Sequence, residues 1–147
     1  MDILILGAGV AGVAAAIALR RQGHAVRLVE RRAGGDAIGG GVVLWPNASF
    51  VLAELGLLER VAALGGRPPA MRRMDRAGAP LMELDIGALD RAMAYPSHAV
   101  LRRDLQAVLL AELARLGMAG ASPRWRRRPT TPARRCASRT AASSAPI

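Results

Sequence analysis

The sequence predicts an α/β fold built around a single βαβ unit, and three observations support this. Residues 3–6 are four consecutive aliphatic residues, as in a strand buried on both faces of a parallel sheet. A G-x-G-x-x-G run follows at residues 7–12. Residues 25–29 then read as a second strand that ends in an acid, Glu30, 18 positions after Gly12. This order of elements is typical of a Rossmann-like dinucleotide site.

The three glycines have separate roles in such a unit. Gly7 permits the tight turn after the strand, Gly9 lets the backbone approach a pyrophosphate, and Gly12 lets the helix pack closely on the strand. The helix that follows ends near Gly23 and offers free N–H groups and a positive dipole end to an anion. The carboxylate of Glu30 can accept both hydroxyls of an adenosine ribose. The alternative is a βαβ unit that uses its glycines for packing alone.

Residues 31–41, RRAGGDAIGGG, are a glycine-rich loop that either wraps a cofactor or acts as a flexible connector. Arg31 and Arg32 could in principle hold the 2′-phosphate of NADP, although the carboxylate of Glu30 would repel it.

The middle of the chain predicts a short strand, two short helices and the two strands of a hairpin. In order, these elements span residues 42–47, 48–55, 57–64, 71–76 and 81–86. Asn47 is expected to cap the first of the two helices. The hairpin methionines Met71, Met74 and Met82 are expected to fill gaps in the core.

A longer amphipathic helix is predicted over residues 102–116, because leucines recur there at i, i+4, i+8 and i+11. Asp104 favours its amino-terminal turn, and Gly117 ends it. Arg102 and Arg103 stand at its start, where one of them could reach a phosphate. On the local pattern alone, a solvated first turn is the favoured interpretation of the two arginines.

The composition changes after residue 117 and divides the chain into a partial domain, 1–117, and a basic, low-complexity tail, 118–147. The formal charge is +10, but the tail holds seven arginines and no acid, and all 11 acidic residues precede it. The basicity therefore belongs to the tail and is no evidence that the folded part binds nucleic acid. The tail has no hydrophobic period, and we expect it to be disordered.

Several other classes of protein are disfavoured by the composition. A single cysteine excludes an internal disulfide and fits a reducing compartment. Two histidines and one cysteine, far apart, make no zinc pattern, so no metal site is expected. The apolar start is interrupted by glycines and is short for a membrane span. We expect a cytoplasmic protein without a membrane span.

Three blocks of the sequence carry a resemblance to a known family. They are GAGVAGVAAAIALRRQGHAVRLVE, IGGGVVLWPNASFVLAELGLLERV and VLRRDLQAVLLAEL. Together they resemble the N-terminal part of the FAD-dependent monooxygenases of the p-hydroxybenzoate hydroxylase type, which include the salicylate-hydroxylase-like enzymes. The third block resembles the family's R-x-D-L helix, whose arginine approaches the flavin. The resemblance therefore implies Arg102 rather than Arg103, with Gln106 as a candidate second contact.

The resemblance implies a partial Rossmann-like FAD-binding domain, with the hairpin belonging to an incomplete substrate layer. It also implies NAD(P)H- and O2-dependent hydroxylation of an aromatic or similar small molecule, with the flavin rather than a protein triad supplying the chemistry. No catalytic side chain is assigned, and no oligomeric state is indicated. The residues expected to bind FAD are Gly7, Gly9, Gly12, Glu30, Arg31, Arg102 and Gln106.

The chain also departs from the family's pattern. The later DG and GD flavin motifs and most of the substrate domain are absent, and the pattern is lost near Gly117. A tail rich in Arg, Pro, Ala and Ser is what a GC-rich gene gives when it is read out of frame, so we expect a truncated or frameshifted product. Two alternatives remain at this point. One is an NAD(P)-dependent dehydrogenase of Rossmann type, which the absence of any lysine disfavours, and the other is an inactive nucleotide-binding fragment.

Overall fold

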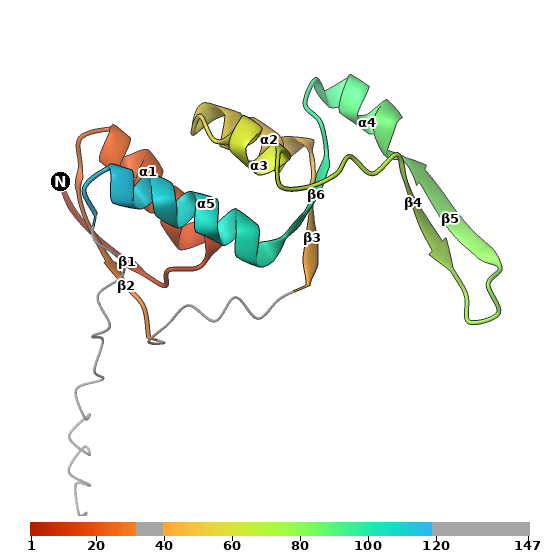
Figure 1. The fold of residues 1–147 in the computed structure, drawn as a ribbon, viewed down its shortest axis with the longest axis horizontal. Helices are drawn as coiled ribbons and strands as arrows, with labels where there is room; N and C mark the ends of the chain where they lie inside the picture. Colours follow the sequence, from red (N-terminus) through yellow and green to blue (C-terminus); the bar gives the residue numbers. More distant parts are fainter. Residues whose placement is uncertain (32–39, 119–147) are drawn as a thin grey trace, which may run out of the picture.

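The computed structural model describes residues 1–31 and 40–118, and in this part of the chain the predicted α/β fold class is confirmed (Figure 1). The described strands form three separate two-stranded sheets, β1–β2, β3–β6 and β4–β5. In chain order the elements are β1 Asp2–Leu6, α1 Val10–Arg21, β2 Ala25–Val29, β3 Gly41–Leu44, α2 Pro46–Glu54, α3 Leu58–Ala62, β4 Ala70–Met74, β5 Pro80–Asp85, α4 Ile86–Met93, β6 His98–Leu101 and α5 Arg102–Arg115.

The first βαβ unit forms as predicted. Strands β1 and β2 pair in parallel, with Leu6 opposite Val29, and α1 is the crossover between them. Ile5 packs against the core on the side of the sheet that α1 covers. The opposite side carries Leu4 and Leu6, which are 58% and 65% exposed. Parallel sheets are ordinarily covered on both faces, whereas only one face of this sheet is covered within the described residues.

Helix α5 lies beside α1 and runs parallel to it, and the two helices share the centre of the core (Figure 1). Val13 and Ile17 of α1 and Leu109 and Leu113 of α5 are at most 1% exposed. Burying a side chain of this size contributes about 1.5–3 kcal/mol. Val61 of α3 completes the centre of this cluster.

The buried carboxylate of Glu112 joins the carboxyl-terminal ends of α1 and α5. Glu112 of α5 is 3% exposed and accepts hydrogen bonds from Arg21 of α1 at 2.7 Å and from Arg115 at 2.8 and 3.0 Å. Arg60 of α3 approaches it at 3.4 Å. The hydrogen bonds from Arg115 and Arg21 outweigh the effect of burial and lower the pKa of Glu112 to about 2. Glu112 is therefore ionised, and it ties α1, α3 and α5 together.

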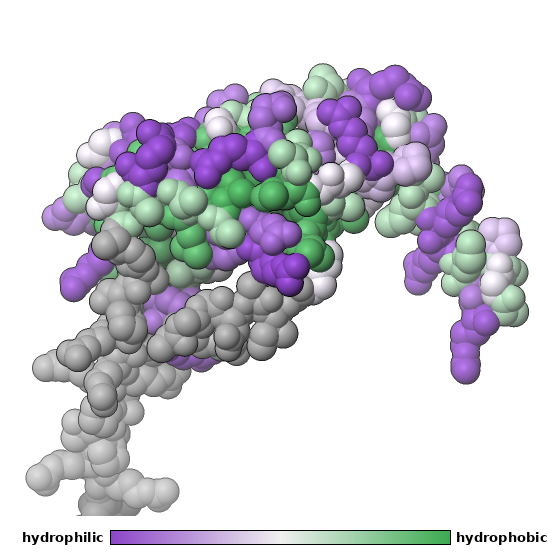
Figure 2. Space-filling view, viewed as in Figure 1, coloured by the Kyte–Doolittle hydropathy of each residue, from purple (hydrophilic) through white to green (hydrophobic). Residues whose placement is uncertain are grey.

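The β4–β5 hairpin is present, but the prediction that its methionines fill the core is wrong. Met71, Met74 and Met82 are 37%, 55% and 45% exposed. Figures 1 and 2 show why, since the hairpin extends away from the helices as an arm that carries both polar and apolar side chains. On one of its faces Arg72 pairs with Glu83, at 3.0 Å. The residue types of a strand do not show whether another element packs against it.

Two further predictions about this region need correction. The second hairpin strand ends at Asp85, one residue earlier than predicted, because the Asp85 side chain accepts a hydrogen bond from the Ala88 amide at 2.9 Å and caps α4. That helix was not predicted. Asn47 does not cap α2, which begins two residues earlier than predicted, with Pro46 at its first position. Most of the predicted loop, 32–39, and the tail from residue 119 lie outside the described residues.

Candidate cofactor-binding site

The predicted site residues converge where the carboxyl ends of β1 and β2 meet the amino-terminal ends of α1 and α5. Two contacts establish this arrangement. Gln106 of α5 reaches the loop before α1 at one end, and Glu112 reaches Arg21 at the other. Because the two helices are parallel, both positive dipole ends point toward the same edge of the molecule, which favours a bound anion there.

The loop from Gly7 to Gly12, called the glycine loop below, has the shape that the sequence predicted. Gly7 has a φ of +103°, a backbone conformation that other residues rarely adopt, and its N–H donates to the Val29 carbonyl at 2.7 Å. A Cβ on Gly12 would collide with the Gly7 carbonyl oxygen. Gly9 differs from both, since it is exposed and a Cβ there would meet no atom within 4 Å. Gly7 and Gly12 thus shape the loop, while the surface over Gly9 is open.

Glu30 lies against this loop rather than out in solvent. Its Oε2 accepts a hydrogen bond from the Ala8 N–H at 2.8 Å. Glu30 is half-buried and directly follows β2. The carboxylate that was predicted to bind a ribose therefore also holds the loop. Arg31, the next residue, is exposed.

Gln106 reaches the same loop residue from the other side. Its Nε2 donates to the Ala8 carbonyl at 2.6 Å. The family resemblance implied Gln106 only as a candidate second contact to the cofactor. Its contact with Ala8 was not predicted, because no local sequence pattern pairs residues that are 98 positions apart.

Arg102 opens α5, one turn before Gln106, and is exposed. Its N–H donates to the Gly40 carbonyl at 3.3 Å, which places the start of α5 next to the start of β3. Its neighbour Arg103 pairs with Asp104 at 3.4 Å. Among the described residues no hydrogen bond or ion pair engages the Arg102 side chain, so of the two arginines it is the better placed to meet an anion.

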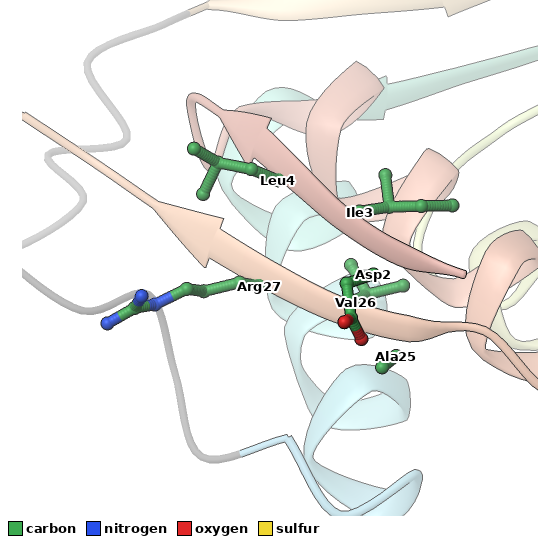
Figure 3. A pocket seen from close by; sticks show the side chains of 6 residues that line it. All are labelled: Asp2, Ile3, Leu4, Ala25, Val26 and Arg27. Carbon is green, nitrogen blue, oxygen red and sulfur yellow. The ribbon is translucent and has the colours of Figure 1, made fainter.

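A hollow of about 370 Å³ lies elsewhere, at the starting ends of β1 and β2 (Figure 3). Figure 3 shows that the side chains lining it, among them Leu4 and Arg27, come from these two strands alone. Ligands of parallel α/β sheets bind outside the carboxyl ends of the strands. This hollow is at the opposite end and belongs to the uncovered part of the sheet, so we do not assign it to the cofactor.

A second group of buried polar residues lies around β6. Ser97 is fully buried, and its hydroxyl donates to Asp90 at 2.6 Å. His98 is 2% exposed, and neither ring nitrogen has a hydrogen-bond partner within the described residues. Burial, reinforced by the positive charge of Arg67, lowers the pKa of His98. Within residues 1–31 and 40–118, no hydrogen bond or ion pair joins Ser97, His98 or Asp90 to the loop of Gly7 to Gly12.

Two kinds of feature are absent from residues 1–31 and 40–118. These residues contain no cluster of three or more His, Cys, Asp or Glu side chains arranged to hold a metal ion. They also contain no helix that is long and apolar enough to cross a membrane.

Glu112, which ties α1, α3 and α5 together, was not predicted, although the sequence contains a signal for it. It lies seven residues after Leu105 and three after Leu109, on the stripe of α5 that faces the core. A lone acid at a core-facing position requires partners of opposite charge, and the partly exposed Arg21, Arg60 and Arg115 supply them.

The family model for the FAD binding domain matches residues 1–128 of this chain. Two curated proteins illustrate the similarity. The 3-amino-4-hydroxybenzoate 2-monooxygenase of Streptomyces cremeus is 39% identical over 109 residues, which cover 73% of this chain and 28% of that protein. The FAD-dependent urate hydroxylase of Mycolicibacterium vanbaalenii is 32% identical over 111 residues, which cover 75% of this chain and 28% of that protein.

Solved structures give the same picture. The tetrameric form of 2-methyl-3-hydroxypyridine-5-carboxylic acid oxygenase superposes with a TM-score of 0.68 at 29% identity, covering 79% of this chain and 29% of the other. HpxO of Klebsiella pneumoniae, complexed with FAD and uric acid, superposes with a TM-score of 0.64 at 26% identity, covering 78% and 29%. This chain thus spans under a third of the length of each of these relatives.

Proposed function

Because this chain belongs to the FAD binding domain family, we propose that it forms the cofactor-binding part of an FAD-dependent monooxygenase. FAD is the cofactor of this family, and the relationship to FAD-dependent hydroxylases expected from the sequence is confirmed. The proposed reaction is hydroxylation of a small aromatic or similar molecule. NAD(P)H supplies two electrons, one oxygen atom of O2 enters the product, and the other leaves as water.

The observation that carries the proposal is the open backbone surface at Gly9, set between the amino-terminal ends of α1 and α5. Gly7 and Gly12 are required for the shape of the loop itself, whereas Gly9 is exposed and has free space above it. Two helix ends provide N–H donors and positive potential at the same edge. A pyrophosphate carries two negative charges and needs close approach to the backbone, so the residues present fit this part of FAD.

We assign the individual roles on the same geometry. The loop from Gly7 to Gly12 would hold the pyrophosphate, Glu30 the adenosine ribose, and Arg102 the flavin side of the cofactor. Arg31 is exposed beside Glu30 and would contribute positive charge near the adenosine half. When bound, the flavin supplies the redox chemistry and the activation of O2. The chain's own residues bind and orient it, and no catalytic side chain is assigned.

A glycine substitution tests the proposed pyrophosphate contact. Gly9 has a φ of −73° and open space around it, so Gly9→Ala should fold like the wild type. It should weaken FAD binding by roughly 1–3 kcal/mol, the usual cost of forcing an extra carbon into a packed contact. Gly66→Ala, also in open space but away from the loop, is the matched control. Calorimetric titration with FAD measures both. Equal affinity of wild type and Gly9→Ala, or no binding by the wild type, would contradict the proposal.

The ribose role of Glu30 has its own test. Glu30→Ala should lose about 1.5–3 kcal/mol of affinity for FAD or for adenosine diphosphate ribose, as for a hydrogen bond to a charged group. Calorimetry with the two ligands decides the question. An unchanged affinity for both would show that the carboxylate serves only the loop.

The proposed reaction is tested separately from cofactor binding. Oxygen uptake should accompany NAD(P)H oxidation when FAD and a candidate aromatic acid are present. NAD(P)H oxidation with no oxygen uptake in the presence of a reducible carbonyl compound would instead point to a dehydrogenase. Absence of both, with FAD bound, would describe a nucleotide-binding fragment without the activity.

A further inference from the structure

Ala8, the residue between the first two glycines, is held by side chains from two distant elements. Its N–H donates to Oε2 of Glu30 at 2.8 Å, and its carbonyl accepts from Nε2 of Gln106 at 2.6 Å. Two carbonyl-type oxygens at this separation would repel each other, so the amide nitrogen of Gln106 must be the atom that faces Ala8. Two consecutive peptide groups of the loop are therefore fixed in direction.

We propose that Gln106 is a positioning residue of the cofactor site and acts through the Ala8 carbonyl. In a trans peptide the N–H points opposite to the carbonyl, so a carbonyl held toward α5 turns the Gly9 N–H away from α5. The hydrogen bond thereby sets the direction in which the loop presents its donor at Gly9. This inference rests on the proposed FAD site and adds a residue and a mechanism to it.

The same hydrogen bond sets where α5 begins relative to the loop. Gln106 lies one turn after Arg102 on α5, and its contact with Ala8 fixes that turn against the loop. The loop meets the pyrophosphate and Arg102 meets the flavin side in the proposed function. Gln106 therefore couples the two ends of the site.

A direct contact between Gln106 and the flavin half of FAD would have a different consequence. ADP contains the adenosine and the pyrophosphate and lacks the flavin. A residue that positions the loop affects ADP and FAD by the same factor, whereas a residue that touches the flavin affects FAD alone.

The experiment compares three variants by calorimetric titration with ADP and with FAD. Gln106→Leu removes the donor, and Gln106→Glu keeps the shape but presents an acceptor to the Ala8 carbonyl. Gln22→Leu makes the same chemical change at the exposed far end of α1 and is the matched control. Titrations run well below the unfolding temperature of each variant, so a purely structural role would leave affinity unchanged. We expect both Gln106 variants to bind both ligands about 3- to 10-fold more weakly, the range for one neutral hydrogen bond.

Two results would overturn the inference. One is wild-type affinity for both ligands in both Gln106 variants, and the other is a loss of affinity confined to FAD. If the wild type binds neither ligand, the proposed function fails, and amide hydrogen exchange of the unliganded protein then tests Gln106. The Ala8 N–H should exchange faster in Gln106→Leu than in Gln22→Leu, and equal rates would refute the positioning role.

Discussion

Replacing Glu112 by Gln should lower the free energy of unfolding by about 2–3 kcal/mol at pH 7, although Gln has the same shape. The pKa of Glu112 falls from 4.5 to about 2 in the folded protein. Each pKa unit is worth about 1.36 kcal/mol, so the full shift corresponds to roughly 3 kcal/mol. The arginine partners Arg21, Arg60 and Arg115 are 33%, 46% and 66% exposed and remain solvated after the substitution, which keeps the loss below the 3–5 kcal/mol of a fully buried broken pair.

The pH dependence of this difference follows from the direction of the pKa shift. A folded-state pKa below the unfolded value gives stability that is present above pH 4.5 and is lost as the pH falls toward 2. Protonated Glu112 and Gln are both neutral. The stability difference between wild type and Glu112→Gln should therefore be constant from pH 7 to about 5.5 and shrink steadily below pH 4.5.

Urea denaturation is the appropriate assay because urea is uncharged and does not screen the ion pairs. Glu83→Gln is the control, since Glu83 and its partner Arg72 are 56% and 62% exposed and a surface pair contributes little. A stability loss at pH 7 no larger than that of Glu83→Gln would refute the reasoning. So would a loss for Glu112→Gln that stays constant down to pH 2.5.

Two other predictions concern Gly12 and His98. Gly12→Ala should destabilise the protein by about 1–3 kcal/mol, because its Cβ would collide with the Gly7 carbonyl and force the loop and α1 apart. Thermal melts measure this loss of stability. A midpoint equal to that of the wild type would mean that the loop accommodates the Cβ without cost. His98 is neutral when buried and its pKa is lowered, so the unfolded chain takes up a proton more readily and stability should fall as the pH drops below about 6.5. His98→Leu should abolish this pH dependence in urea titrations at pH 7 and 5.5, and an unchanged slope in the variant would assign the effect to another group.

The part of the fold that the sequence predicted best is the part that is specified locally. The strand, glycine turn, helix and second strand of residues 2–29 follow from residues adjacent in the chain, and the structure has all four. The shape of the loop was also predictable, because Gly7 and Gly12 are required by backbone geometry rather than by distant partners. The amphipathic period of α5 likewise identified its buried leucines.

The wrong predictions share a different cause, since each depends on contacts with residues that are distant in the sequence or on competition between neighbouring elements. The residue types of a strand do not show whether another element covers it, so the exposure of Met74 and Met82 was not predictable. Asp85 ends a strand and caps a helix at once, and only the competition between the two elements decides the boundary. The contacts of Ala8 with Glu30 and Gln106 join residues 22 and 98 positions apart.

The position of Arg102 relative to the glycine loop is set by polar contacts more than by the apolar seam between the helices. Apolar contacts between α1 and α5 are non-directional, so two parallel helices lined with small and branched residues can exchange one close packing for another by sliding. Gln106 and Glu112 are six residues apart on α5, or roughly 9 Å along the axis. One is bonded to the loop before α1 and the other to Arg21 near the end of α1. Two directional contacts at this separation permit one register only, and they fix Arg102 at the edge where the loop presents Gly9.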